Sequence, residues 1–113
     1  METKFNFNSQ VATTREQSER LLALGLKKET ADMIYPSYTD MKSGKLLKVS
    51  DTPVVIYKLQ SCYDITAWSL HRLMILAEMK GTAFSDLDTA YETTISIIAA
   101  KIRFGYFNKE YLV

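Results

Sequence analysis

The sequence has few of the residues from which common metal and catalytic sites are built. It contains one cysteine, Cys62, and one histidine, His71, among its 113 residues. One cysteine cannot form a disulfide within the chain, and this pair cannot supply the ligands of a zinc site. All four glycines are explained by predicted helix ends or a turn, so none is left for a phosphate-binding loop. We therefore expect no metal and no cofactor.

Neither charge nor hydropathy indicates a polyanion or a membrane as the partner. The chain contains fourteen Lys and Arg residues and thirteen Asp and Glu residues, which gives a net charge of +1. That balance excludes a general polyanion binder on net charge alone. Apolar stretches such as the one around residues 95–100 are far shorter than the roughly 18 residues of a membrane span, and the start METKFNFNSQ has no apolar signal core. We expect a cytoplasmic protein with no membrane partner.

The composition is that of one globular domain. Hydrophobic residues make up 47% of the chain and charged residues 24%, which are ordinary proportions. A chain of this length buries roughly 65% of its unfolded surface and needs no disulfide or metal to hold its core. No repeat or linker divides the sequence, so we expect a single domain over residues 1–113. Residues 1–10 are polar and expected to be loosely ordered, with alternation at Phe5 and Phe7 that would suit a short edge strand.

Local start and stop signals predict a helix over residues 14–24. Thr13 and Glu16 have the spacing of a capping box, in which each side chain binds the backbone N–H of the other residue. Gly25 stands where a left-handed residue ends a helix. Leu26 is placed to fold back onto the helix and complete a Schellman ending.

Residues 30–59 change to a pattern typical of short strands, rich in β-branched and aromatic side chains. Pro36 and Pro53 lie at segment edges, where a missing N–H is tolerated, and Ser43 with Gly44 predicts a turn. The connections are too short for crossover helices, so two or three antiparallel strands are expected. The segments are 32–35, 46–49 and 54–59.

Two further helices are expected in the second half of the chain. The first covers residues 67–79, with Thr66 as its N-cap and Gly81 after its end. The second follows Ser85 as N-cap and ends before Gly105, with apolar residues at spacings of three or four. Those apolar residues are Leu87, Tyr91, Ile95, Ile98 and Ile102. The elements predict an α+β fold, in which a small antiparallel sheet of two or three strands is covered on one face by three helices.

Residues that could carry catalysis have simpler structural explanations. A Cys–His pair would use Cys62 as nucleophile and His71 as base, with Asp64 nearby, but no oxyanion-binding group is evident. Ser69 lies two positions before His71 on the same predicted helix and therefore points away from it. We expect no catalytic residue and no enzyme.

A local excess of positive charge lies between residues 41 and 60, where Asp51 is the single acid. Together with nearby tyrosines, the lysines would let segment 35–63 bind single-stranded nucleic acid by charge and stacking. The alternative, which we favour, is that edge lysines discourage strand aggregation while the tyrosines pack half-buried. The lysines are Lys42, Lys45, Lys48 and Lys58, and the tyrosines are Tyr35, Tyr38, Tyr57 and Tyr63.

Three motifs carry a resemblance to a known group. They are the stretch TREQSERLLALGLKKETADM, the tetrapeptide AWSL at 67–70 and the pair GY at 105–106. Together they resemble a family of small uncharacterised proteins from gut anaerobic bacteria, often found in prophage or mobile-element regions. The resemblance spans roughly residues 11–107, and many members have Pro where this chain has Thr66. Since the family has no assigned activity, the resemblance implies a genetic context and no chemistry.

The expected function is that of a non-enzymatic accessory or interaction protein of a phage or mobile element, acting through protein contacts. Aromatic residues make up 12% of the chain, and those left exposed would form an association surface. The expected partner is an unidentified protein. A second copy of this chain, in a homodimer, is one such partner. The alternative is a nucleic-acid-binding module that uses segment 35–63.

Overall fold

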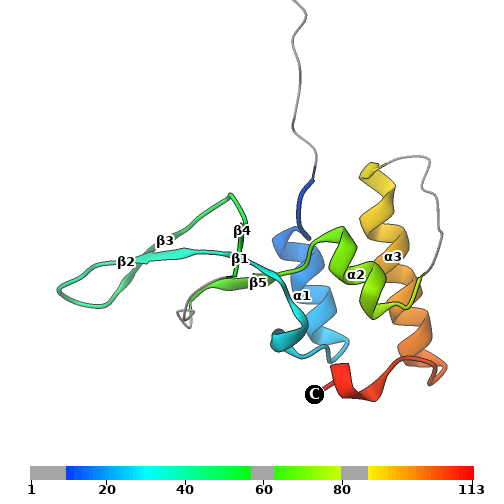
Figure 1. Cartoon of the computed structure of the whole chain (residues 1–113). Coiled ribbons are helices and arrows are strands. Elements are labelled where there is room, and N and C mark those ends of the chain that lie inside the picture. The colour runs from blue at the N-terminus through cyan, green and yellow to red at the C-terminus, as the bar shows by residue number, and fades with distance from the viewer. Residues whose placement is uncertain (1–9, 57–62, 80–86) are drawn as a thin grey trace, which may run out of the picture.

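The computed structural model describes residues 10–56, 63–79 and 87–113, and these residues confirm an α+β fold (Figure 1). Three α-helices are joined by two 3₁₀ turns and five short strands within the described part of the chain. The expected edge strand at Phe5 and Phe7 lies outside the described residues. In chain order the elements are α1 (Arg15–Ala23), η1 (Lys28–Thr30), β1 (Met33–Tyr35), β2 (Ser37–Thr39), β3 (Leu46–Val49), β4 (Val54–Val55), β5 (Ile65–Ala67), α2 (Leu70–Leu76), α3 (Leu87–Arg103) and η2 (Lys109–Tyr111).

The strands form two small antiparallel sheets. One sheet has the order β4-β1-β5, and Met33 of β1 lies between Val55 of β4 and Ala67 of β5. The other sheet is the β2–β3 hairpin. Pro36 separates β1 from β2, as its position at a segment edge predicted. The strand β5 was not expected, because residue 67 was assigned to the start of a helix.

The start of α1 differs by one residue from the prediction. Thr14, not Thr13, is the N-cap, and its capping-box partner is Gln17, not Glu16. Thr13 is instead fully buried, where its backbone N–H donates to Trp68 O at 2.8 Å and its Oγ1 accepts from Trp68 N at 3.0 Å. A long-range contact therefore decides which of two adjacent threonines caps the helix.

The predicted glycine endings of α1 and α3 are confirmed. Gly25 has φ +102°, and Leu26 N donates to Leu21 O at 3.3 Å, which is the long hydrogen bond of a Schellman ending. Gly105 has φ +77°, and Tyr106 N donates to Lys101 O at 2.8 Å in the same way. The predicted cap at residue 85 lies outside the described residues.

The predicted boundaries of α2 are wrong at both ends. Ser69, not Thr66, is its N-cap, because Thr66 is a buried residue of β5. The helix ends early in a Schellman turn, in which Met79 N donates to Met74 O at 3.0 Å. The left-handed position of this turn is occupied by Glu78, with φ +57°. The expected terminator, residue 81, lies outside the described residues.

The main core lies among the helices and is centred on Trp68. This side chain is fully buried, and its indole Nε1 donates to Thr30 Oγ1 at 3.0 Å. Helices α2 and α3 pack against each other, and α1 packs on β5. Other buried members of this core are Leu21, Leu26, Leu73, Leu76, Tyr91, Ile95, Ile98 and Phe107.

The β2–β3 hairpin continues from β1 and extends away from the three helices (Figure 1). Its central residues are exposed, whereas β1 and β5 contribute Met33, Tyr35 and Ala67 to a second, smaller core. No helix in the described part of the chain is both long enough and apolar enough to span a membrane.

Candidate functional site

The candidate site is the β2–β3 hairpin, residues 37–49, which we call the arm. Its tip is shaped by Asp40, whose Oδ1 accepts from Lys42 N and whose Oδ2 accepts from Ser43 Oγ, both at 3.0 Å. Gly44 N donates to Asp40 O at 2.7 Å, and Gly44 has φ +70°, a conformation that favours glycine. The turn predicted at Ser43 and Gly44 is therefore confirmed.

Three contacts hold the base of the arm to the body. Asp64 Oδ1, just before β5, accepts from both Ser37 N and Ser37 Oγ at 2.7 Å. Ser50 N donates to Pro36 O at 2.7 Å and closes the strand pair. Arg15, the first residue of α1, donates from Nη2 to Val49 O at 3.0 Å. These contacts set the direction in which the arm leaves the body.

The strand register assigns the arm's side chains to two faces. Tyr38 pairs with Lys48 and Thr39 pairs with Leu46, so Leu47 is an extra residue in a β-bulge. Asp40 N donates to Lys45 O at 2.8 Å, which places Lys45 opposite Asp40. Because directly paired residues share a face and alternate residues return to it, Tyr38, Lys45 and Lys48 lie on one face. Leu46 lies on the other.

The arm brings together three of the four lysines predicted as candidate contacts. Lys42, Lys45 and Lys48 are all exposed, and none is within 4.0 Å of a carboxylate of another described residue. Lys48 Nζ lies 5.5 Å from the centre of the Tyr38 ring, a cation–π distance. Asp51, the single acid of the segment, pairs instead with Arg15 at 3.4 Å. The fourth, Lys58, lies outside the described residues.

The predicted set of four tyrosines does not form one stacking surface. Tyr35 is only 7% exposed, and its hydroxyl donates to Thr13 O at 2.6 Å. Burial raises the pKa of Tyr35, while the nearby Arg15 charge opposes that rise. Tyr38 and Tyr63 are exposed, but only Tyr38 belongs to the arm. Tyr57 lies outside the described residues.

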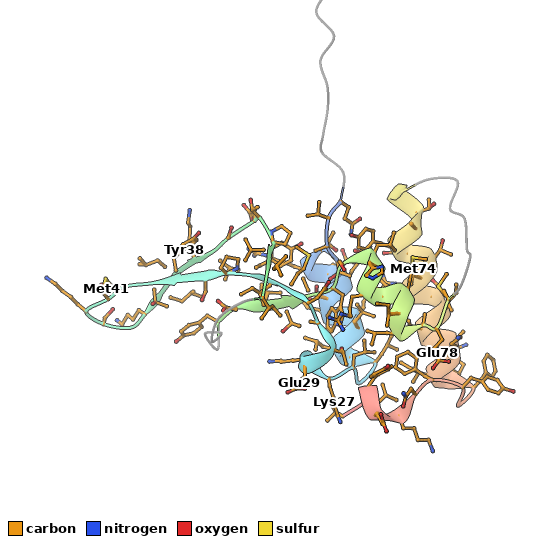
Figure 2. All side chains as sticks on the ribbon, in the orientation of Figure 1. Lys27, Glu29, Tyr38, Met41, Met74 and Glu78 are labelled. Carbon is orange, nitrogen blue, oxygen red and sulfur yellow. The ribbon has the colours of Figure 1, made fainter. Side chains whose placement is uncertain are left out.

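Sequence reasoning missed the exposed apolar residues of the arm. Met41 is 100% exposed, Leu47 is 69% exposed and Leu46 is 42% exposed. Figure 2 shows Met41 at the tip and Tyr38 further back along the hairpin. The segment LLKV was predicted as a strand from its apolar and β-branched composition, and that composition does not tell which of its apolar side chains are exposed. The neighbouring lysines, which we interpreted as residues of an edge strand, were the sign that side chains of this segment lie exposed.

Two hollows on the helical body are lined by residues that the structure describes. The first, about 600 Å³, lies between η1, α2 and η2, and its lining combines lysine, arginine and glutamate side chains with apolar ones. The second, about 770 Å³, lies over the end of α2 beside Met74 and Glu78, which Figure 2 labels. Among the described residues no three metal-ligating side chains come together. The residues of the first hollow are Lys27, Glu29, Thr30, Arg72, Ile75, Leu76, Glu110 and Tyr111.

Two of the residues considered for catalysis, Asp64 and Ser69, make structural hydrogen bonds. His71 is exposed on α2, and Asp64 accepts the hydrogen bonds from Ser37. The Ser69 hydroxyl donates to Asp32 Oδ2 at 2.6 Å and accepts from Arg72 N at 3.1 Å, so it serves the start of α2. Cys62, the nucleophile considered for a Cys–His pair, lies outside the described residues.

The motif segments TADM and AWSL lie side by side. Met33 pairs with Ala67 across β1 and β5, and Ser69 N donates to Asp32 Oδ1 at 2.8 Å.

A scan against protein-family models found no match, and searches of curated proteins and of solved structures found none either. The resemblance to the proteins of gut anaerobes therefore stays a prediction that rests on the quoted motifs.

Proposed function

We propose that the protein is a non-enzymatic interaction protein that binds a partner protein through the arm. The observation that carries this proposal is the exposure of Met41, Leu46 and Leu47 on a hairpin that extends from the body. Large apolar side chains grouped on an exposed surface mark interaction sites in soluble proteins. Asp64 accepts hydrogen bonds from Ser37 and Arg15 donates one to Val49, and these bonds at the base of the arm present that surface in a defined direction.

The proposal extends to the biological setting. The resemblance to proteins of prophage and mobile-element regions favours an accessory role in such an element, in the cytoplasm of its host. The genes beside this one test that role directly. Phage or transfer genes as recurrent neighbours would support it, and a stable association with a host metabolic operon would contradict it.

Site-specific photo-crosslinking in the cells that produce the protein tests the proposed function. A photoreactive residue replaces Leu47 on the arm, and the matched control replaces Ser96, which is exposed on α3. We expect a discrete adduct from position 47 that resists nuclease and is destroyed by protease. A homodimer would give an adduct of twice the chain mass. Equal adducts from both positions, or none from position 47, would contradict the proposal.

Nucleic-acid binding is the second candidate, supported by the three lysines that the arm brings together. It is less favoured, because Tyr35 is buried in the core and the Tyr38 ring is already in contact with Lys48. Replacement of Lys42, Lys45 and Lys48 with alanine tests it. If the candidate is correct, wild-type protein binds single-stranded oligonucleotides with a strong salt dependence that the triple variant loses. Absence of binding by the wild-type protein at low salt would exclude it.

A further inference from the structure

The outer edge of β3 lacks a strand partner within the described part of the chain. The sheet that contains it has only β2 and β3, so β3 is paired on one side alone. An isolated two-stranded hairpin is at best marginally stable in water, and three or more strands with an apolar face are needed for independent stability. The arm would therefore gain order from a third strand. Strand addition at an exposed edge is a common way of binding an extended peptide.

The two faces of the arm differ in chemistry along this edge. Lys45 and Lys48 share one face, and Leu46 lies on the opposite face. Successive residues of an incoming strand also alternate between faces. Carboxylates on alternate positions of that strand would lie beside the two lysines. Apolar side chains on the intervening positions would lie beside Leu46.

A second copy of this chain suits the edge poorly. Two β3 strands placed side by side would bring lysines of like charge together on one face, which destabilises a strand pair. Lysines on an edge strand are a common means of preventing such self-pairing. The arm carries three lysines and one aspartate, and Asp40 is engaged in the turn. The charge of the arm therefore complements an acidic strand.

We propose that the β3 edge of the arm binds an extended protein segment in which acidic and apolar residues alternate, adding it as a third strand. This inference rests on the proposed function, since it names the partner chemistry of the same surface. The acidic side chains pair with Lys45 and Lys48, and the backbone hydrogen bonds form along Leu46–Val49. Recognition requires both the charge and the free backbone of the ligand.

A binding assay on the full chain tests the proposal with defined probes. The first probe is a labelled, capped peptide in which Glu and Val alternate. A second peptide has Lys in place of each Glu, and a third has Pro in place of the central Val, which removes a backbone donor. A fourth probe is oligothymidine. Fluorescence anisotropy measures Kd, and amide hydrogen exchange measures protection along β3.

Charge reversal on the arm is compared with the same reversal on the body. Lys45→Glu/Lys48→Glu changes the proposed site, and Lys28→Glu/Lys109→Glu changes two exposed lysines of η1 and η2. We expect the arm variant to raise the Kd for the Glu–Val peptide by roughly tenfold or more. The body variant should leave the Kd within about twofold.

The proposal holds if the Glu–Val peptide alone binds, slows exchange at Leu46–Val49 and loses affinity with the arm variant. Equal binding of the Lys–Val or Pro peptide would overturn it, as would unchanged affinity after the arm reversal. Binding of oligothymidine alone would overturn it in favour of nucleic acid. If position 47 still crosslinks to a protein while no peptide binds, the proposed function stands and the strand-addition proposal falls. If both experiments fail, both fall.

Discussion

At the scale of single residues, Asp32 and Ser69 connect two segments that are far apart in the sequence. The Asp32 carboxylate accepts from both Ser69 N and Ser69 Oγ, and the same hydroxyl caps α2 through Arg72 N. The Ser69 side chain therefore caps α2 and also links the start of that helix to Asp32, the residue before β1. The residues of TADM and AWSL have structural roles in this junction.

Ser69→Ala is expected to lower the free energy of unfolding by about 1–2 kcal/mol, because it removes the N-cap of α2 and one donor to Asp32. Urea denaturation measures the change. Ser96→Ala, on the exposed face of α3, serves as the control and should change stability by less than about 0.5 kcal/mol. Equal effects of the two substitutions would contradict the role assigned to Ser69.

Glu78 occupies a backbone conformation that costs a non-glycine residue free energy. Its φ of +57° lies in the left-handed region, which costs an L-residue about 1–2 kcal/mol, partly offset by the flexibility that glycine adds to the unfolded chain. Glu78→Gly should therefore raise the free energy of unfolding by roughly 0.5–1 kcal/mol. Thermal unfolding measures the gain. Glu78→Ala removes the same charge but keeps the strain, so an equal gain there would show that charge and not backbone is responsible.

At the scale of elements, the glycine endings of α1 and α3 were the most predictable features, whereas the end of α2 was not. Gly25 and Gly105 end α1 and α3 through local hydrogen bonds, which sequence spacing reveals. The start of α1 was less predictable, because the Trp68 backbone, 55 residues away, engages the predicted cap Thr13 and leaves Thr14 to cap the helix. The strand β5 has only three residues, and pairing with β1 defines it. Local propensity carries no information about such long-range pairing.

An exposed ion pair links α1 to α3 and makes stability depend on pH. Hydrogen bonds from Arg20 and then Gln17 lower the pKa of Glu92 below its ordinary value. Because this pKa is lower in the folded state, the pair stabilises the fold above the unfolded-state pKa of about 4.3. That contribution is lost as the pH falls through the lower, folded-state pKa.

The Glu92→Gln variant should therefore have a lower free energy of unfolding than the wild-type protein at pH 7. The two free energies should be equal once the pH is below the folded-state pKa of Glu92. Urea denaturation at a series of pH values measures the difference. The effect should be small, because both side chains are nearly half exposed, and it should shrink at high salt. A difference that persists unchanged at the lowest pH would show that the carboxylate charge is not its source.

At the scale of the whole molecule, the helical body and the arm have different surfaces. The body buries Trp68 and the apolar faces of its helices, as the sequence periodicity predicted. The arm exposes apolar residues of a segment that the same reasoning predicted only as a short strand. A segment such as LLKV has one local pattern whether it lies in a central sheet or on a projecting hairpin. Only the arrangement of the whole chain distinguishes the two, and the interaction site follows from that arrangement.

The most direct test of the arm as the partner-binding element is the crosslink yield from position 47 in two altered backgrounds. Met41→Ser/Leu46→Ser removes apolar surface from the arm, and Ile75→Ser/Tyr106→Ser removes exposed apolar surface from the body. We expect the arm background to lower the yield of the protein adduct by roughly tenfold, in line with the loss of apolar contacts at an interface centre. The body background should leave the yield unchanged. Loss of the adduct in the body background, with the arm background unaffected, would contradict the assignment.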